Sequence, residues 1–301
     1  MKKFLLVCTL LSSALHAWAQ IDPLYAQYMN NPLTINPAYT GLNNNLNGSV
    51  SYRKQWAGFE GSPSTINVST HSSFANNKMG LGLMLIQDKI GVNKNTEAHL
   101  TYSYRLSKGE TTFSFGLQAG VINFRSDNEE LNPFDPQDPA FNGSQNYVKP
   151  AVGAGLIMKS ERFFIGLSVP RLLNSSVSTN GVETSVYQQH FYGMAAYVFN
   201  LSERVRFKPS VLLKGVKGSP LSLDYNASFN LDEKYTFGLF ARNLNSCGFL
   251  TQIRFNEVYR LGYSFEIPLG NSIETRFTTH EIVLGFNLAV FNAHTASITN
   301  F

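Results

Sequence analysis

The chain has 301 residues, of which 15% are charged, and its formal net charge is +4. Removal of Lys2 and Lys3 with an export signal leaves +2, and no basic tract indicates a nucleic-acid partner. Aromatic residues make up 13% of the chain, with 23 Phe and 14 Tyr. Low charge combined with many aromatic residues is typical of a barrel whose outer face contacts lipid.

The first 19 residues have the organisation of a secretory signal peptide. Lys2 and Lys3 precede a short apolar core, and the small residues Ala17 and Ala19 predict cleavage between Ala19 and Gln20. No later stretch approaches about 18 continuous apolar residues, so the sequence predicts no membrane helix. An exported chain of this kind is periplasmic, secreted or a β-barrel.

The region 20–46 is rich in proline, asparagine and tyrosine. The dipeptides Asp22-Pro23, Asn31-Pro32 and Asn36-Pro37 favour turns or extended backbone, and apolar side chains lie between them. One interpretation is an irregular leader before the first strand. The other is an ordered segment that plugs a lumen or docks on a partner. The residues of this second hypothesis are Tyr25, Tyr28, Asn31, Pro32, Asn36, Pro37 and Tyr39.

From about residue 48 onward, apolar and polar residues alternate with a period of two. Leu100, Tyr102 and Tyr104, for example, alternate with Thr101 and Ser103. Each run has about 9–11 residues, the length that a tilted strand needs to cross a bilayer. The candidate strands are 47–56, 64–74, 78–88, 95–107, 110–124, 148–159, 162–170, 188–200, 204–215, 219–230, 234–243, 247–256, 258–268 and 279–291. About fourteen strands, an even number, predict an all-β, up-and-down antiparallel outer-membrane barrel.

The expected domains are a signal peptide (1–19), an N-terminal plug or docking segment (20–46) and a transmembrane β-barrel (47–301). Tight connectors at 107–109 and 232–233 contrast with long ones at 126–147 and 172–187. This contrast predicts short turns on one rim of the barrel and longer loops on the other. No helix of more than a turn or two is expected.

Charged residues share the polar face of the strands, as a water-filled lumen requires. They are Arg53, Arg105, Arg206, Lys208, Arg242, Arg254, Arg260, Asp224, Glu266 and Glu281. A secreted β-sandwich or propeller is the soluble alternative, because alternation alone is compatible with a sheet whose polar face meets water. Such a protein would be extracted from membranes by carbonate and would lack heat-modifiable migration.

No motif in the sequence indicates catalysis or a cofactor. The six histidines lack metal-ligand spacing, and His71 and His99 are expected to face the lumen. His280-Glu281 is expected to be a structural pair in the lumen. Cys247 is alone once Cys8 leaves with the signal, so no intrachain disulfide is expected. We therefore expect no enzymatic activity, no metal and no cofactor.

Two long blocks of the sequence resemble the PorP/SprF family. The first begins at Gln20 with QIDPLYAQYM and continues through Asn31-Pro32-Leu33 and the NPAYTG run at 36–41. The second is YRKQWAGFEGSPST at 52–65. Shorter resemblances are DKIG at 88–91, LGYSF at 261–265 and HEIVL at 280–284. The resemblance covers the whole mature length.

The resemblance implies an outer-membrane β-barrel of Bacteroidetes that is associated with the type IX secretion system. Its implied partners are outer-membrane lipid, other secretion components and a large secreted protein that carries a type IX C-terminal domain. Secretion, surface attachment and gliding-adhesin export are the implied roles. In the second block, we expect partner contacts from Arg53, Gln55, Trp56, Gly58, Gly61 and Pro63, with Trp56 as the main anchor. The alternative function is a channel or transporter for a small or lipidic solute.

Overall fold

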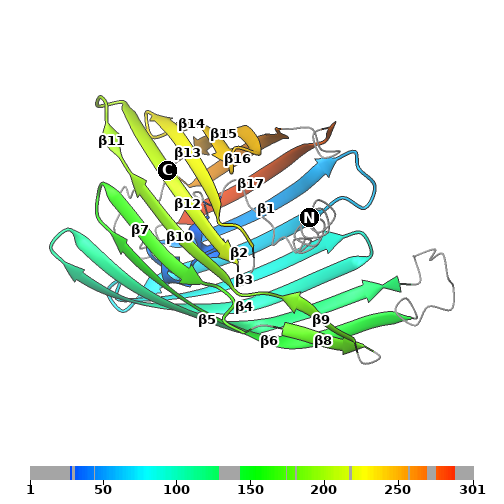
Figure 1. Ribbon diagram of the computed structural model, residues 1–301. Helices are drawn as coiled ribbons and strands as arrows, with labels where there is room; N and C mark the ends of the chain where they lie inside the picture. Colours follow the sequence, from blue (N-terminus) through cyan, green and yellow to red (C-terminus); the bar gives the residue numbers. More distant parts are fainter. Residues whose placement is uncertain are drawn as a thin grey trace, which may run out of the picture.

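Fourteen antiparallel strands close into a barrel (Figure 1). The computed structural model describes residues 28, 31–43, 45–128, 143–173, 175–179, 182–216, 219–256, 258–269 and 276–288. Two 3-10 helices, η1 (Pro32–Thr34) and η2 (Pro37–Tyr39), precede the first strand. The barrel strands are β1 (Leu46–Ala57), β2 (Ser64–Phe74), β3 (Met79–Ile90), β4 (Asn93–Lys108), β5 (Thr111–Asp127), β6 (Ser144–Lys159), β7 (Phe163–Val169), β10 (His190–Tyr197), β12 (Val205–Val216), β13 (Ser222–Leu231), β14 (Tyr235–Arg242), β15 (Ser246–Phe255), β16 (Tyr259–Pro268) and β17 (Thr278–Leu288).

Each strand pairs with its neighbours in the chain, and the ring closes where β1 pairs with β17. On the other side of the ring, β10 pairs directly with β12. Closure matters because a bilayer core offers no water to backbone N–H and C=O groups, which must find partners within the protein. Each of the fourteen predicted strand ranges overlaps a barrel strand, so the predicted architecture is confirmed.

The connection between β7 and β10 differs from the prediction. The loop expected at 172–187 contains a hairpin of β8 (Ser175–Thr179) and β9 (Val182–Tyr187). Asn180-Gly181 lies between these two runs, and Asn-Gly is a strong signal for a two-residue hairpin turn. The single strand expected over 188–200 is interrupted at Val198, after which β11 (Phe199–Asn200) pairs with β12.

The two faces of the barrel wall have opposite polarity. On β4, Leu100 is 67% exposed on the outer face, while Thr101 is only 1% exposed on the inner face. The same alternation runs through the other strands, so large apolar side chains cover the outside and polar ones fill the inside. This polarity is the reverse of a water-soluble sandwich and suits a wall with lipid outside and a polar interior.

The two rims also differ. Connectors 75–78, 109–110, 160–162 and 232–234 are short and lie at one end, which we call the turn rim. Connectors 58–63, 128–143 and 170–189 are longer and lie at the other end, the loop rim. Outer-membrane barrels have short periplasmic turns and longer extracellular loops. Within the described residues, no helix has the length and apolarity to cross a membrane.

Candidate functional site

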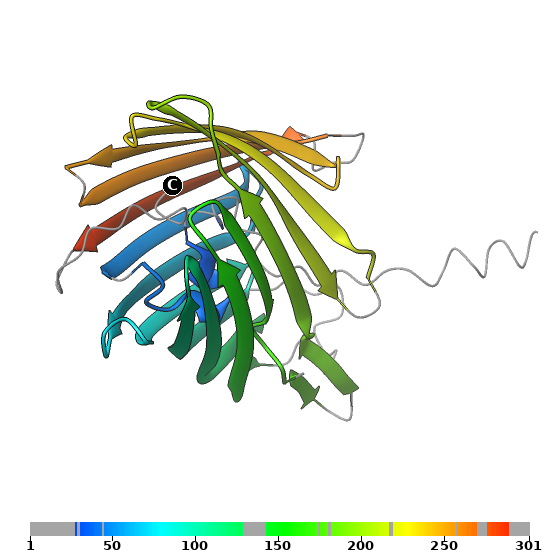
Figure 2. The ribbon, with the colours of Figure 1, turned by 90° about the vertical axis from the view of Figure 1, so that its left-hand side faces the viewer.

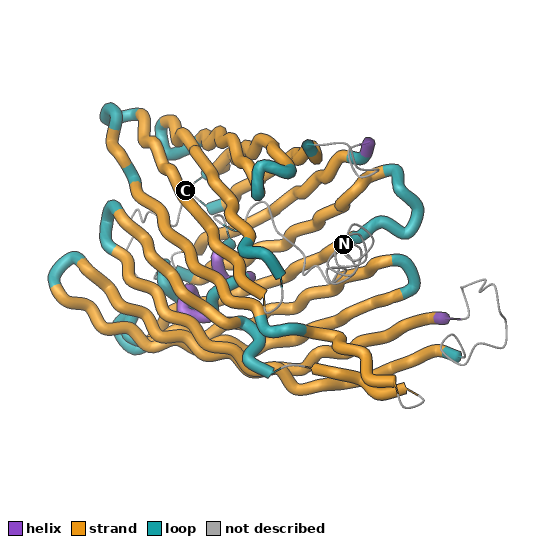
Figure 3. The backbone as a smooth tube through the Cα atoms, viewed as in Figure 1, coloured by secondary structure: helices purple, strands orange, loops and turns teal. Residues whose placement is uncertain are grey.

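Residues 31–43, which we call the lumen segment, lie inside the barrel (Figures 2 and 3). Leu33 and Ala38 are fully buried, and Tyr39 is 2% exposed. The apolar side chains of the segment join a cluster on the inner wall formed by β6, β7, β10 and β12, which includes Phe164 and Met194. The lumen segment therefore packs on the wall as a core would.

The Asn-Pro dipeptides give the lumen segment its local shape. In each, the asparagine occupies the N-cap position of a 3-10 turn whose first residue is proline, a position where the missing N–H and fixed φ are favourable. The Asn36 side chain accepts a hydrogen bond from the Ala38 N–H (2.9 Å), and the Thr40 hydroxyl donates to the Pro37 carbonyl (2.7 Å). These local bonds hold a compact shape that needs neither a helix nor a strand.

Side chains of the wall donate hydrogen bonds to the backbone carbonyls of the lumen segment. The donors come from four strands: Ser168 Oγ to Ile35 O (2.6 Å), Ser114 Oγ to Ala38 O (2.6 Å), Ser103 Oγ to Thr40 O (2.6 Å), Lys159 Nζ to Leu42 O (3.1 Å) and the Arg105 guanidinium to Gly41 O. A buried carbonyl without a partner costs about 1–3 kcal/mol. The wall thus supplies the partners that water would otherwise provide.

Further hydrogen bonds run from the segment to the wall. Asn31 Nδ2 donates to the hydroxyls of Ser49 (2.8 Å) and Ser69 (3.0 Å). Asn36 Nδ2 lies 3.3 Å from the Leu156 carbonyl and 3.2 Å from that of Leu167. At the other end of the segment, Gly41 N–H donates to His71 Nδ1 (2.9 Å). Six strands, β1, β2, β4, β5, β6 and β7, therefore contribute bonds to the segment.

Glycines in the wall make room for the segment. A Cβ built on Gly116 would lie 2.0 Å from the Ala38 nitrogen, and one on Gly155 would lie 2.1 Å from Asn36 Oδ1. A Cβ on Gly80 would lie 2.3 Å from the Thr40 carbonyl oxygen. A strand glycine often marks a place where another backbone approaches closely. At Gly116 and Gly80 that backbone is the lumen segment, and at Gly155 the Asn36 side chain fills the space.

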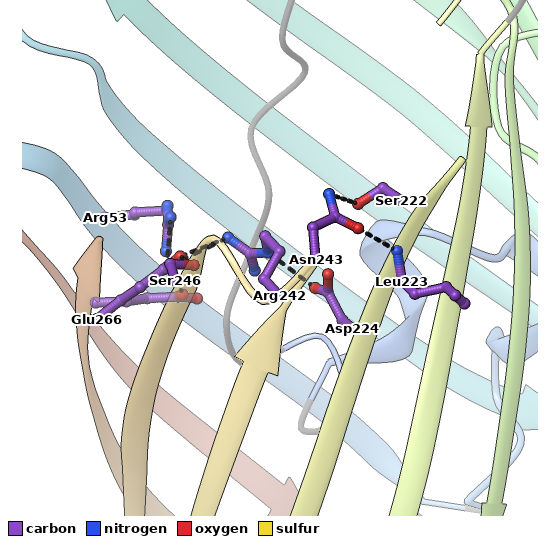
Figure 4. A network of polar contacts seen from close by, with 9 residues as sticks. Arg53, Ser222, Leu223, Asp224, Arg242, Asn243, Ser246 and Glu266 are labelled. Carbon is purple, nitrogen blue, oxygen red and sulfur yellow. Dashed lines mark hydrogen bonds and ion pairs between the residues drawn. The ribbon is translucent and has the colours of Figure 1, made fainter. Parts of the chain in front are cut away.

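A second polar cluster lies on the inner wall near the loop rim (Figure 4). Arg242 contacts Asp224 (2.9 Å) and Glu266 (3.0 Å), and Arg53 contacts Glu266 (3.1 Å) and Glu281 (3.5 Å). Ser246 donates a further hydrogen bond to Glu266 (2.6 Å). The two guanidinium groups and three carboxylates form a buried network across five strands. We call it the charge network.

Tyr28 lies next to the charge network, close to Asp224 and Arg242. It is 3% exposed, and burial raises the pKa of its hydroxyl, with a smaller contribution from the Asp224 carboxylate. A separate inner group joins Glu97 to His99 (2.8 Å) and to Arg171 (2.6 Å). Within the described residues, no group of three or more His, Cys, Asp or Glu is arranged to hold a metal ion.

The block 55–63, which we call the loop 55–63, consists of the end of β1 and the connector to β2. Gln55 N–H donates to the Pro63 carbonyl (3.0 Å), and Gly91 N–H donates to the Gly61 carbonyl (2.9 Å). Trp56 lies at an irregularity in the β1–β17 pairing, is half-buried and has a left-handed φ of 51°. The neighbouring Phe59 is 48% exposed. This loop therefore presents aromatic surface at the loop rim.

The structure divides the predicted site residues into three groups. Tyr28, Asn31, Pro32, Asn36, Pro37 and Tyr39 are buried in the barrel. Arg53 belongs to the charge network. Gln55 and Trp56 lie at the end of β1, and Gly58, Gly61 and Pro63 lie in the connector to β2. Tyr25 and the predicted cleavage site at Ala19 and Gln20 lie outside the described residues.

One expectation about a residue pair is wrong. His280 and Glu281 are neighbours in β17, and adjacent residues of a strand point to opposite faces. Glu281 points inward to Arg53. On the outer face, His280 Nδ1 forms a hydrogen bond with the Tyr263 hydroxyl (2.8 Å), and His280 Nε2 forms one with the Thr278 hydroxyl (3.0 Å). They do not form a lumen pair.

The sequence reasoning missed the wall residues that hold the lumen segment. Ser103, Ser114, Ser168 and Lys159 were not identified as site residues, and Arg105 was expected only to line the lumen. Their positions on the polar face were predictable from the period of two. Their partners were not, because nothing in the sequence reports which strand faces which part of the segment.

Comparison with known proteins agrees with this architecture. The sequence profile of the family described as "Type IX secretion system membrane protein PorP/SprF" matches residues 17–286. No curated protein matches the chain. Among solved structures, a CymD monoaromatic hydrocarbon channel has a TM-score of 0.50 at 10% identity, with 94% of this chain and 97% of that chain covered.

Two further solved barrels are similar. The toluene transporter TodX of Pseudomonas putida has a TM-score of 0.48 at 9% identity, covering 92% of this chain and 97% of its own. The outer membrane protein Omp33 of Acinetobacter baumannii has a TM-score of 0.47 at 9% identity, covering 83% and 100%. At 10% identity, the likeness to the CymD channel concerns the barrel fold alone. The family profile matches most of the chain, and this match shows that the chain belongs to the PorP/SprF family of type IX secretion system membrane proteins.

Proposed function

We propose that this chain is a non-enzymatic outer-membrane barrel of the type IX secretion system that supports the secretion or surface attachment of a cognate secreted protein. In this proposal the lumen segment plugs the barrel, and the loop 55–63 takes part in docking the partner. The observation that carries the proposal is the set of side-chain hydrogen bonds from the wall to the carbonyls of the lumen segment.

A plug is supported by the specificity of these contacts. A leader that merely rested in the lumen would require neither serines at hydrogen-bond distance from successive carbonyls nor glycines beneath its backbone. Both are present, at Ser114 and Gly116 on the same strand. A tightly held plug favours a scaffold over a conducting pore, because solutes would have to displace a packed segment.

Docking at the loop rim is supported by the aromatic surface there. Trp56 and Phe59 lie on one loop, whose backbone is braced against Gly91 in the β3–β4 turn and whose Phe59 ring packs on Phe277 at 5.4 Å. Rigid aromatic anchors on an ordered loop are typical of energetically important interface residues. The partner expected here is a large secreted protein that carries a type IX C-terminal domain.

Co-purification tests the docking role. The full-length protein with Trp56→Ala is expected to keep heat-modifiable migration but to retain at least about fivefold less secreted partner after purification from native outer membranes. Leu244→Ala is the matched control, because Leu244 is 75% exposed in a turn at the same rim but lies on a different connector. Equal partner recovery from Trp56→Ala and wild type would remove the loop from the proposal.

Planar-bilayer conductance separates the scaffold from the alternative of a channel for small or lipidic solutes. A plugged barrel is expected to show no steady conductance, whereas an open channel would conduct without any change to the chain. Stable single-channel steps from the wild-type protein would contradict the plug and favour the channel.

A further inference from the structure

The outer face of the barrel carries a row of positive charge near the loop rim. Lys89 on β3 lies directly opposite Lys94 on β4, and Lys94 lies directly opposite Arg125 on β5. All three side chains are exposed on the outside of the wall. We call these residues the cationic row.

Placing like charges directly opposite each other on a sheet is destabilising. Arg125 is partly balanced by Asp127, whose carboxylate lies 3.0 Å away and also accepts a hydrogen bond from Ser144 (2.9 Å). Among the described residues, no carboxylate lies within ion-pair distance of Lys89 or Lys94. The sheet therefore bears a repulsion that an external anion would relieve.

The cationic row also lines a hollow. A concavity of about 450 Å³ opens on this outer face, with Lys89, Lys94, Arg125 and Asp127 together with Asn123 and Asn146 in its wall. The amide groups add neutral hydrogen-bond donors to the cations. Such a combination suits the oxygens of a phosphate group, which accept several hydrogen bonds at once.

The position of the row identifies the source of the anion. The second outward-facing row from the cationic row toward the membrane centre contains Leu85 and Val121. These side chains are 44% and 49% exposed and belong to the lipid-facing band. Four residues of a tilted strand rise by about 10 Å, which brings the cationic row to the level of the lipid headgroups. The strands β4 and β5, with 16 and 17 residues, are long enough to reach it.

We propose that the cationic row and its hollow form a binding site for the phosphate-bearing headgroup of a membrane lipid in the leaflet at the loop rim. Lys89 and Lys94 would share one phosphate, and Arg125 and Asn146 would complete its hydrogen bonds. A bound headgroup would fix the orientation of β3–β6 relative to the membrane. The site lies on the outer face of the wall, and the lumen segment lies inside the barrel. The inference rests on the outer-membrane placement in the proposed function, but not on the plug or on the partner.

Lipid retention tests the site directly. The full-length barrel in a nonionic detergent is titrated with diphosphorylated lipid A and, in parallel, with the same lipid after removal of its phosphates; retained lipid is counted by native mass spectrometry. Wild type should retain the phosphorylated form preferentially. Each of Lys89→Gln, Lys94→Gln and Arg125→Gln should lower that retention by about fivefold, the effect of one basic residue at a membrane surface.

Lys78→Gln/Lys108→Gln is the control, because both lysines are exposed at the opposite rim. This variant should retain the phosphorylated lipid as wild type does. Inorganic phosphate is the second arm: competition by millimolar phosphate as effective as by the lipid would identify a site for free phosphate and overturn the lipid assignment. Equal retention of both lipid forms, or unchanged retention in all three variants, would overturn the site itself.

A second measurement guards against misfolding. In detergent without anionic lipid, Lys94→Gln removes two like-charge contacts and should leave the temperature of heat-modifiable unfolding equal to that of wild type or higher. Addition of diphosphorylated lipid A should then raise the unfolding temperature of wild type more than that of the variant. A variant that is destabilised without lipid would show that the lysines serve the fold instead.

Discussion

Gly116 offers the sharpest test of how tightly the lumen segment is held. In Gly116→Ala, the new Cβ would lie 2.0 Å from the Ala38 nitrogen and 2.3 Å from its Cα. Real Cβ atoms essentially never approach another heavy atom closer than 3.0 Å, so the segment must retreat by about 1 Å. Both obstructing atoms belong to the backbone, so no side-chain rotation can relieve the overlap.

The expected magnitude has two parts. Overpacking of a well-packed interior costs about 1–3 kcal/mol. The retreat also stretches the 2.6 Å bond from Ser114 to the Ala38 carbonyl, and a buried carbonyl that loses its partner costs about 1–3 kcal/mol. The seated position of the segment is therefore expected to lose about 2–6 kcal/mol, which raises the population of the displaced segment by at least about 30-fold.

Hydrogen exchange of the folded barrel in detergent measures this change, through the protection of amides in residues 31–43. Gly193→Ala is the matched control, because a Cβ at this strand glycine meets only the Leu167 side chain at 3.6 Å and the Leu213 side chain at 3.8 Å or beyond. The control should keep wild-type protection. If Gly116→Ala protects the segment as well as Gly193→Ala does, then the close packing inferred between segment and wall is refuted.

Three further predictions concern the charge network, an exposed ion pair and the end of the lumen segment. Arg242→Met should destabilise the fold by about 3–5 kcal/mol, seen as a lower unfolding temperature, because it removes the guanidinium partner of the buried Asp224 and leaves Glu266 with Arg53. Arg204→Met should lower that temperature far less than Arg242→Met does, since Arg204 and Asp232 form an exposed pair. The hydrogen bond from Arg204 lowers the pKa of Asp232, so the pair stabilises the folded state at pH values above the carboxyl's ordinary pKa. This contribution is lost as the pH falls through the lowered pKa. Carbon-13 NMR should show a higher pKa of Asp232 in Arg204→Met. Gly41→Ala should weaken protection of the segment's end, because Gly41 has a φ of +65° and its Cβ would lie 2.7 Å from a backbone oxygen.

Individual residues show which features of the barrel a local sequence pattern can predict. Arg53 was correctly expected in the lumen, because the period of two assigns each strand residue to a face. The same rule places the adjacent residues His280 and Glu281 on opposite faces of the wall, so it excludes the lumen pair that was expected. Asn180-Gly181 favours the hairpin at 175–187, but the mostly polar residues of this region are typical of a loop.

The strands and the polarity of the two faces follow from the amino-acid sequence alone. These features depend on residues that are close in the chain: alternation fixes the face, and turn-forming residues fix the ends. The Asn-Pro dipeptides favour turns or extended backbone, and the structure forms a 3-10 turn at both of those in the lumen segment.

The contacts of the lumen segment and the pairing of the cations depend on the three-dimensional arrangement of the strands. Asn36 meets the Leu167 carbonyl across 131 positions of the chain, and the Ser168 hydroxyl reaches Ile35 across 133. Lys94 meets Arg125 only because of the register of β4 on β5. Such contacts follow from the closure, register and tilt of the whole barrel, which no local pattern of residues encodes.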